Sequence, residues 1–209
     1  MTENEKLLSN GIKEIGVRCT SQQVLAFITY LGELKKWSRA YNLTGLKTDR
    51  DIIIRNFLDS VLFCKVIPGD LHSLADIGSG AGFPGIPIKI MLPDLKVVLI
   101  EPTRKKALFL KHVCHSLELR DIEVIDKRIE DISGITVDAL VTRALFSVSD
   151  FVKKAGHILN SNGIYILSKG PKLEEEMTET ASLKAAVTDV VLPFEKTIRH
   201  LVVVKKQGV

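Results

Sequence analysis

The sequence predicts a doubly wound α/β fold, in which helices cover both faces of a mostly parallel sheet. Continuous apolar runs alternate with helical patterns through the middle of the chain, which favours parallel strands buried on both faces. The run 74–77 passes directly into a glycine-rich turn and then into a helix. Two strand-like stretches near the end, 187–192 and 200–204, lie too close together for a helix between them and predict an antiparallel hairpin.

Composition narrows the class of protein. The 209 residues carry a formal net charge of +4, which by itself is too small to indicate a nucleic-acid partner. No apolar run approaches the ~20 residues that span a bilayer, and the acidic, polar start is unlike a secretory signal, so we expect a cytoplasmic protein that does not contact a membrane. Cys19, Cys64 and Cys114 are far apart in sequence, which indicates neither a disulfide framework nor a metal site.

Three helices are expected before the first strand. A short one covers about 6–15, Thr20 or the serine after it can cap a long amphipathic one, and Asp49 can cap a third. Residues 1–70 are too few for a separate core, so we expect a helical annex packed on a domain of residues 71–209, as one structural unit.

Trp37 and Tyr41 stand among basic residues after the second helix. Aromatic rings in such a setting can stack on bases while the cations meet phosphates. Because the two rings are one helical turn apart, they can equally pack the annex, and for Trp37 packing is the preferred interpretation.

After the glycine-rich turn, strands and helices follow one another in order. The expected strands are 96–101, 122–125, 137–141 and 164–168, and the expected helices are 103–117, one capped by Ser147, and a more polar one at 173–183.

The glycine-rich turn is the candidate ligand site, because glycine permits positive φ and lets a ligand lie against the backbone. The stretch from Gly80 to Gly85 satisfies the dinucleotide pattern G-x-G-x-x-G, a weak match on its own. Glu101, about 20 residues later, can take the hydroxyls of a ribose. Asp76, at the end of the first strand, suits the cationic amino-acid end of a methyl donor. Asp76 could instead be a helix or turn cap. Burying a carboxylate without a partner costs free energy, however, and this favours the interpretation that Asp76 binds a ligand.

Short motifs over nearly the whole chain are similar to those of one family, the bacterial 16S rRNA (guanine-N7) methyltransferases, or glucose-inhibited division protein B family. These motifs are Lys36-Trp37, 41–44, Leu58-Asp59-Ser60, 76–87, Glu101 with Arg104-Lys105-Lys106, Arg128-Ile129-Glu130, Thr142-Arg143-Ala144, Lys169-Gly170 and Arg199-His200-Leu201. Two positions depart from the family, since Pro102 and Thr142 stand where it often has serine.

The resemblance implies a class I S-adenosylmethionine-dependent methyltransferase fold, S-adenosylmethionine as cofactor, and 16S rRNA or the small ribosomal subunit as partner. It implies that the donor is bound by Asp76, Gly78, Ser79, Gly80, Phe83, Glu101, Ile129, Glu130 and Arg143, and that RNA is bound by Arg104, Lys105, Lys169 and Arg199. Without the resemblance, Glu130 would be interpreted as a helix cap or a solvated acid.

Methyl transfer to N7 of guanine needs no general base, because that nitrogen presents an unprotonated lone pair. The enzyme has to supply proximity and alignment, and Arg143 is the candidate for positioning. Other functions left open are methylation of a small molecule on the same fold, an NAD-dependent oxidation that uses the glycine pattern, and non-catalytic ribosome binding. We expect a monomer without a metal ion.

Overall fold

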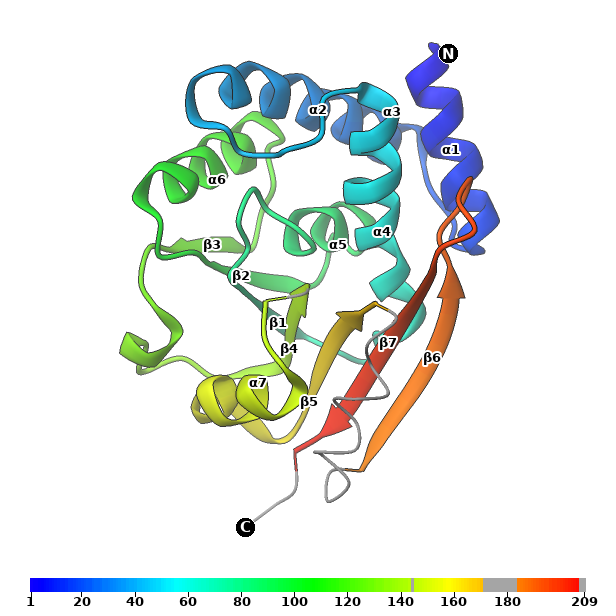
Figure 1. The fold of residues 1–209 in the computed structure, drawn as a ribbon. Coiled ribbons are helices and arrows are strands. Elements are labelled where there is room, and N and C mark those ends of the chain that lie inside the picture. The colour runs from blue at the N-terminus through cyan, green and yellow to red at the C-terminus, as the bar shows by residue number, and fades with distance from the viewer. Residues whose placement is uncertain (144, 171–183, 207–209) are drawn as a thin grey trace.

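A single seven-stranded sheet organises the computed structural model, which describes residues 1–143, 145–170 and 184–206 (Figure 1). The strand order is β3-β2-β1-β4-β5-β7-β6. Its strands are β1 (Ser73–Ile77), β2 (Lys96–Ile100), β3 (Ile122–Ile125), β4 (Val137–Arg143), β5 (Leu159–Lys169), β6 (Ala185–Val191) and β7 (Ile198–Lys205). The first five are parallel, and β7 pairs antiparallel with both β5 and β6. The predicted doubly wound sheet with its terminal hairpin is therefore confirmed.

Helices lie on both faces of the sheet, and Figure 1 shows α1 to α6 gathered on one side and α7 on the other. The first side holds α1 (Glu3–Ile15), α2 (Ser21–Tyr41), α3 (Asp49–Ile52), the π-helix η1 (Ile53–Leu58), α4 (Asp59–Val61), η2 (Leu62–Lys65), α5 (Gly85–Met91) and α6 (Arg104–Ser116). The second holds η3 (Ile129–Asp131), α7 (Val148–Ala155) and η4 (Gly156–Ile158). The expected helix at 173–183 lies outside the described residues.

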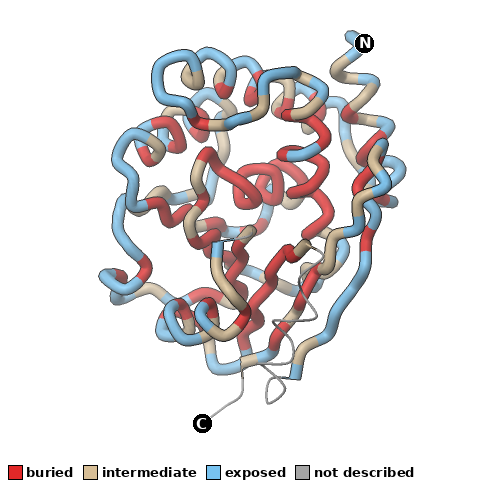
Figure 2. The backbone as a smooth tube through the Cα atoms, viewed as in Figure 1, coloured by how far each residue is buried: buried red, intermediate tan, exposed pale blue. Residues whose placement is uncertain are grey.

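The alternation of side chains along β1 divides the core between the two faces. Leu74 belongs to the hydrophobic cluster that also contains Leu8 and Phe27 of the N-terminal helices, whereas Ala75 belongs to the cluster under α7. Figure 2 shows the buried backbone concentrated in the central strands and in the segment that runs from α3 to η2. The N-terminal helices and the sheet thus share one core.

The third predicted helix is present but irregular. Thr48, and not Asp49 as expected, caps it, because the Thr48 hydroxyl accepts a hydrogen bond from the N–H of Asp51 at 3.0 Å. The helix then passes through the π-turn η1. Asn56 and Asp59, in and just after this turn, are 5% and 3% exposed. Since π-turns frequently mark functional sites, these two buried polar side chains direct attention to this segment.

Two other predicted caps are confirmed. Thr20 begins α2 with a capping box, in which Gln23 bonds back to the Thr20 backbone, and the Ser147 hydroxyl accepts from the N–H of Asp150. Across the described ranges, the structure contains no helix long and apolar enough to cross a membrane.

Candidate active site

The turn after β1 is built from glycines in the left-handed region. Gly78, Gly80 and Gly82 have φ values of 71°, 59° and 100°, which glycine adopts without strain. The N–H groups of Gly78 and Ser79 both donate to the carbonyl of Ile100, at 2.8 and 3.1 Å, and fasten the turn to the end of β2. A Cβ added at Gly80 would face open space, with the nearest atom 3.9 Å away. A ligand can therefore approach the backbone at this position.

Asp76 is completely buried beneath this turn. Its Oδ2 accepts from the N–H of Gly85 at 2.8 Å, a contact that needs glycine because a Cβ there would lie 2.8 Å from the same oxygen. Its Oδ1 is buried and has no hydrogen-bond partner within the described part of the chain. Burial raises the pKa of Asp76 to about 7, although the Gly85 N–H and the Arg143 charge act in the opposite direction. An ammonium group of a bound ligand would satisfy the orphaned oxygen.

We expect donor affinity to depend on pH through Asp76. The ionised carboxylate attracts the ammonium of the donor, so affinity should rise about tenfold per pH unit up to about pH 7 and then level off. Isothermal titration calorimetry with S-adenosylhomocysteine between pH 5.5 and 8 measures this, and Asp76→Asn should give a weak, flat profile. An equally steep profile in the variant would assign the titration to another group.

The stability of the donor-free protein should change with pH in the direction opposite to the donor affinity. Because the folded-state pKa of Asp76 lies above its ordinary value of 3.8, the native state binds more protons than the unfolded state between those two pH values. The donor-free protein should therefore lose stability as the pH rises through this window. Thermal unfolding of wild type and Asp76→Asn across pH 4 to 8 compares the two slopes, and the variant should have the flatter one.

Glu101 follows β2 and connects the turn to α6. It is 4% exposed, its Oε2 accepts from the N–H of Gly80 at 2.8 Å, and its Oε1 accepts from the N–H of Thr103 at 2.9 Å. Each carboxylate oxygen has a second lone pair and can still accept from a ribose hydroxyl. The geometry is compatible with the role expected for Glu101.

Tyr30 of α2 braces the turn from the annex side, and sequence reasoning missed it. The ring is fully buried and stacks on Phe57 and Phe83, with centroids 5.1 and 5.5 Å apart. Its hydroxyl donates to the carbonyl of Ala81, and burial raises its pKa well above the ordinary value, which keeps the donor proton in place. A tyrosine on the apolar face of an amphipathic helix needs a polar partner, and this was the available signal.

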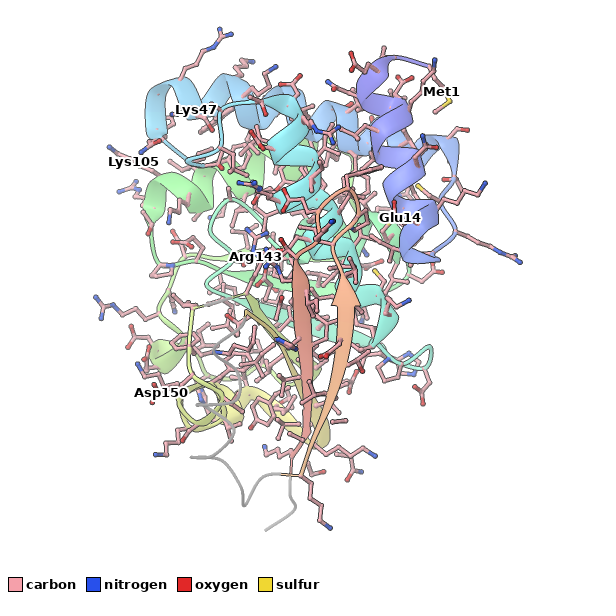
Figure 3. All side chains as sticks on the ribbon, turned by 45° about the vertical axis from the view of Figure 1, so that its right-hand side comes forward. Met1, Glu14, Lys47, Lys105, Arg143 and Asp150 are labelled. Carbon is pink, nitrogen blue, oxygen red and sulfur yellow. The ribbon has the colours of Figure 1, made fainter. Side chains whose placement is uncertain are left out.

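Arg143, the last residue of β4, reaches across to the π-turn. Its Nη2 donates to Oδ1 of Asn56 at 3.0 Å, and its Nη1 donates to the carbonyl of Arg55 at 3.1 Å and to Oδ2 of Asp59 at 3.4 Å. The guanidinium lies 5.2 Å from the ring centroid of Phe83. Figure 3 shows Arg143 in the middle of the molecule, between the helices and the sheet.

Asp59 connects Arg143 to a second arginine. Its Oδ1 accepts from Nε of Arg199 at 2.6 Å, so one buried carboxylate lies between two cations that come from different strands. Sequence reasoning gave Asn56 and Asp59 no role. The available signal was the occurrence of polar side chains in two adjacent pairs, 55–56 and 59–60, inside the otherwise apolar stretch from 52 to 62.

These parts enclose a pocket of about 190 Å³. It is lined by Leu43, Thr44, Asn56, Gly78, Ser79, Gly80, Ala81, Phe83 and Arg143. Five of the predicted donor-binding residues therefore meet at one cavity, and the N-terminal segment contributes three further residues that were not predicted. Together with the open space at Gly80 and the orphaned oxygen of Asp76, this arrangement fits the amino-acid half of S-adenosylmethionine.

Two predicted adenine contacts do not line that cavity. Ile129 is 5% exposed and packs in the core cluster under α7, together with Ile100. Glu130 is exposed and lies 3.7 Å from the ammonium of Lys154.

The predicted RNA contacts divide between two places. Arg143 pairs with Ser168 in the register of β4 and β5, and Lys169 pairs with His200 of β7, so the hairpin brings Arg199 to the same sheet edge as the ends of β4 and β5. Lys169 is 8% exposed and donates to the carbonyl of Phe146. Arg104 and Lys105, by contrast, are exposed at the start of α6.

Trp37 and Tyr41 differ in their surroundings and in their exposure to solvent. Trp37 packs against Phe109 and His112 with ring centroids 5.7 and 5.0 Å apart, which confirms the packing interpretation. Tyr41 is 45% exposed, and the ammonium of Lys105 lies 5.7 Å from its ring centroid. Only the second ring is accessible to a partner.

Comparisons with known proteins match this chain to one family. The GidB family model, described as rRNA small subunit methyltransferase G, matches residues 23–202. The ribosomal RNA small subunit methyltransferase G of Geotalea uraniireducens is 36% identical over 212 residues, covering 97% of this chain and 96% of the relative. The protein of that name from Acetivibrio thermocellus is 34% identical over 213 residues, covering 96% and 88%.

Solved structures resemble the fold. A methyltransferase from Pyrococcus furiosus has a TM-score of 0.60 at 15% identity, and the match covers 87% of this chain and 98% of that one. M. jannaschii TYW2 in complex with AdoMet has a TM-score of 0.53 at 16% identity, covering 68% and 72%. At such identities the likeness shows the fold alone, which is that of the class I S-adenosylmethionine-dependent methyltransferases.

Proposed function

Because this chain belongs to the rRNA small subunit methyltransferase G family, we propose that it transfers a methyl group from S-adenosylmethionine to N7 of a guanine in small-subunit (16S) ribosomal RNA. One structural observation carries the proposal. The glycine turn leaves open space at Gly80, which lines the same pocket as Arg143, and the strand that leads into this turn carries the orphaned carboxylate oxygen of Asp76. This cradle suits a cationic amino-acid group attached to a nucleoside.

The protein residues hold and align the reactants. Asp76 would bind the donor ammonium and Glu101 the ribose, while Ile129 and Glu130 would border the adenine. S-adenosylmethionine, when bound, supplies an electrophilic methyl group on its sulfonium. The guanine N7 already carries a lone pair, so no side chain has to remove a proton, and the rate gain comes from proximity and orientation. Arg143 would position the donor carboxylate or the guanine.

Transfer of radiolabelled methyl groups to small subunits from cells that lack the enzyme tests the function. We expect one labelled guanine, methylated at N7, and calorimetric binding of S-adenosylhomocysteine without binding of NAD. Tight NAD binding with no response to S-adenosylhomocysteine would favour an oxidoreductase. Label that enters only small molecules would favour a small-molecule methyltransferase instead.

We propose that Arg143, Lys169 and Arg199 form a basic rim that holds RNA phosphates, with Arg104 and Lys105 further along. The rim lies at the carboxyl ends of the strands, where open α/β sheets bind ligands. Lys169→Ala or Arg199→Ala should weaken RNA binding and reduce its salt slope by roughly one, with donor affinity nearly unchanged. Fluorescence anisotropy of a labelled rRNA fragment at several salt concentrations measures the slope.

The matched control for the rim is Lys96→Ala. Lys96 is an exposed cation at the first position of β2, at the opposite edge of the same sheet, and its removal should leave the slope as in wild type. If the Lys169 and Arg199 variants keep both the wild-type slope and wild-type methylation, the rim does not bind RNA.

We infer further that the protein acts as a monomer in the cytoplasm on 16S rRNA or the small ribosomal subunit, with residues 1–70 and 71–209 working as one unit. The lining of the pocket by residues of both segments supports their working as one unit. Analytical ultracentrifugation at assay concentrations tests it, and a dimer would contradict it.

A further inference from the structure

A second hollow, of about 260 Å³, lies beside the donor pocket. It is bounded by the last turns of α2, the loop 42–48 and Ile52 at the end of α3, and we name it the α2 groove. The lining residues on which the following argument depends are Lys35, Ser38, Arg39, Thr44, Leu46 and Lys47. Thr44 lines both the α2 groove and the donor pocket, so the two hollows adjoin.

We propose that the α2 groove binds the sugar–phosphate backbone of the RNA strand next to the guanosine that reaches the donor pocket. This inference rests on the proposed function and assigns it a second RNA contact, separate from the basic rim. A strand that delivers one base to the pocket at Thr44 has to continue across an adjoining surface, and the α2 groove offers a concave one.

The charges of the α2 groove favour phosphate. Lys35 is neutralised, since its ammonium lies 2.5 Å from Oδ1 of Asp49, and that carboxylate also accepts from Asn4 at 2.9 Å. Arg39 and Lys47 are exposed and form no ion pair with any residue in 1–143, 145–170 or 184–206. Two cations are thus left for an anionic ligand, and phosphate oxygens are the commonest acceptors for such side chains at nucleic-acid interfaces.

Ser38 and Leu46 supply the remaining parts of a nucleotide site. Ser38 Oγ, in the last turn of α2, is shielded from solvent and lacks a hydrogen-bond partner among the described residues, which is uncommon for a buried hydroxyl. A ribose hydroxyl or a phosphate oxygen would satisfy it. Leu46, half-buried in the wall, offers an apolar surface for the carbon atoms of a ribose.

An accessible ring near the α2 groove favours RNA over a free anion. Tyr41 follows the groove residues at the end of α2 and is 45% exposed, with the Lys105 ammonium 5.7 Å from its ring centroid. In the view of Figure 3, Lys47 and Lys105 lie on the same flank of the molecule. An aromatic ring among cations suits a single strand, whose bases stack on the ring while its phosphates meet the charges.

The test removes both groove cations together, as Arg39→Ala with Lys47→Ala. A matched control removes two exposed cations outside the groove, as Lys36→Ala on α2 with Lys111→Ala on α6. The probe is a fluorescein-labelled single-stranded fragment of small-subunit rRNA that contains the methylated guanine. Two lost phosphate contacts should lower the salt slope by roughly 1.4 and the affinity about tenfold or more, while the donor dissociation constant stays within about twofold.

Four results of this experiment would count against RNA binding in the α2 groove. Equal slopes in the groove and control variants would overturn the inference while leaving the proposed function intact, provided that wild type methylates the fragment. A parallel loss of donor affinity would assign these residues to the donor pocket and also overturn it. Competition by inorganic phosphate with an unchanged RNA slope would make the groove a free-anion site. Failure of wild type to bind or methylate RNA would overturn the proposed function and this inference together.

Discussion

Gly80→Val is expected to lower the affinity for S-adenosylmethionine at least ~100-fold, while lowering the free energy of unfolding by only about 1–2 kcal/mol. The backbone of Gly80 is left-handed, and a Cβ there would point into open space instead of striking protein atoms. The valine methyl groups would occupy the volume that the donor needs, so the loss falls on binding. Calorimetry with S-adenosylhomocysteine and thermal unfolding separate the two effects.

Gly16→Val is the matched control. Gly16 has a φ of +86° at the end of α1, and a Cβ added there would meet no atom within 4 Å. It therefore introduces the same kind of backbone strain away from the pocket, and donor affinity should stay at the wild-type value. Normal affinity in the Gly80 variant would remove the glycine turn from the donor site.

Asp59→Ala is expected to abolish methylation and to lower the free energy of unfolding by about 2–4 kcal/mol. The side chains of Arg143 and Arg199 are only 22% and 25% exposed, and both bond to this carboxylate, at 3.4 and 2.6 Å. Removing it leaves two partly buried cations facing each other without a counter-charge. Chemical denaturation and single-turnover methylation measure the two losses.

Asp189→Ala provides the comparison for Asp59. Asp189 also bonds to a basic side chain, His200 at 2.7 Å, but the Asp189 side chain is 63% exposed, and exposed pairs contribute less than about 1 kcal/mol. Its removal should leave methylation unchanged. If the Asp59 and Asp189 variants lose similar stability and keep their activity, Asp59 has no special part in holding the arginines.

The sheet and the glycine turn could be predicted because their signals are local. The apolar run 74–77 contains an acid near its end and is followed by four closely spaced glycines. Strand burial and the positive φ values of the turn are both properties of these few neighbouring residues. The direction of the last strand followed from the short connection of the hairpin, and this direction placed Arg199 at the same edge as Arg143. Both inferences needed only chain geometry.

The parts that escaped prediction depend on packing between distant segments. Tyr30 meets Ala81 across 51 residues of sequence, and Asp59 meets Arg143 across 84. Sequence periodicity does not predict such contacts. It identifies the apolar face of a helix, but it does not identify the segment that packs against that face. The π-turn at Ile53–Leu58, which contains the pocket residue Asn56, also departs from the regular helical spacing on which the sequence prediction relied.

The hydrogen bond from Tyr30 to Ala81 has a consequence for local opening of the molecule. When α2 separates from the sheet, the glycine turn loses the hydrogen bond from Tyr30. The donor-binding conformation of the turn is therefore populated only while α2 is packed on the sheet. A ligand that binds only the braced turn must then suppress the opening of α2 by mass action. Amide protons along α2 (Ser21–Tyr41) should accordingly exchange more slowly with solvent when the donor site is filled, although no residue of α2 lines the donor pocket.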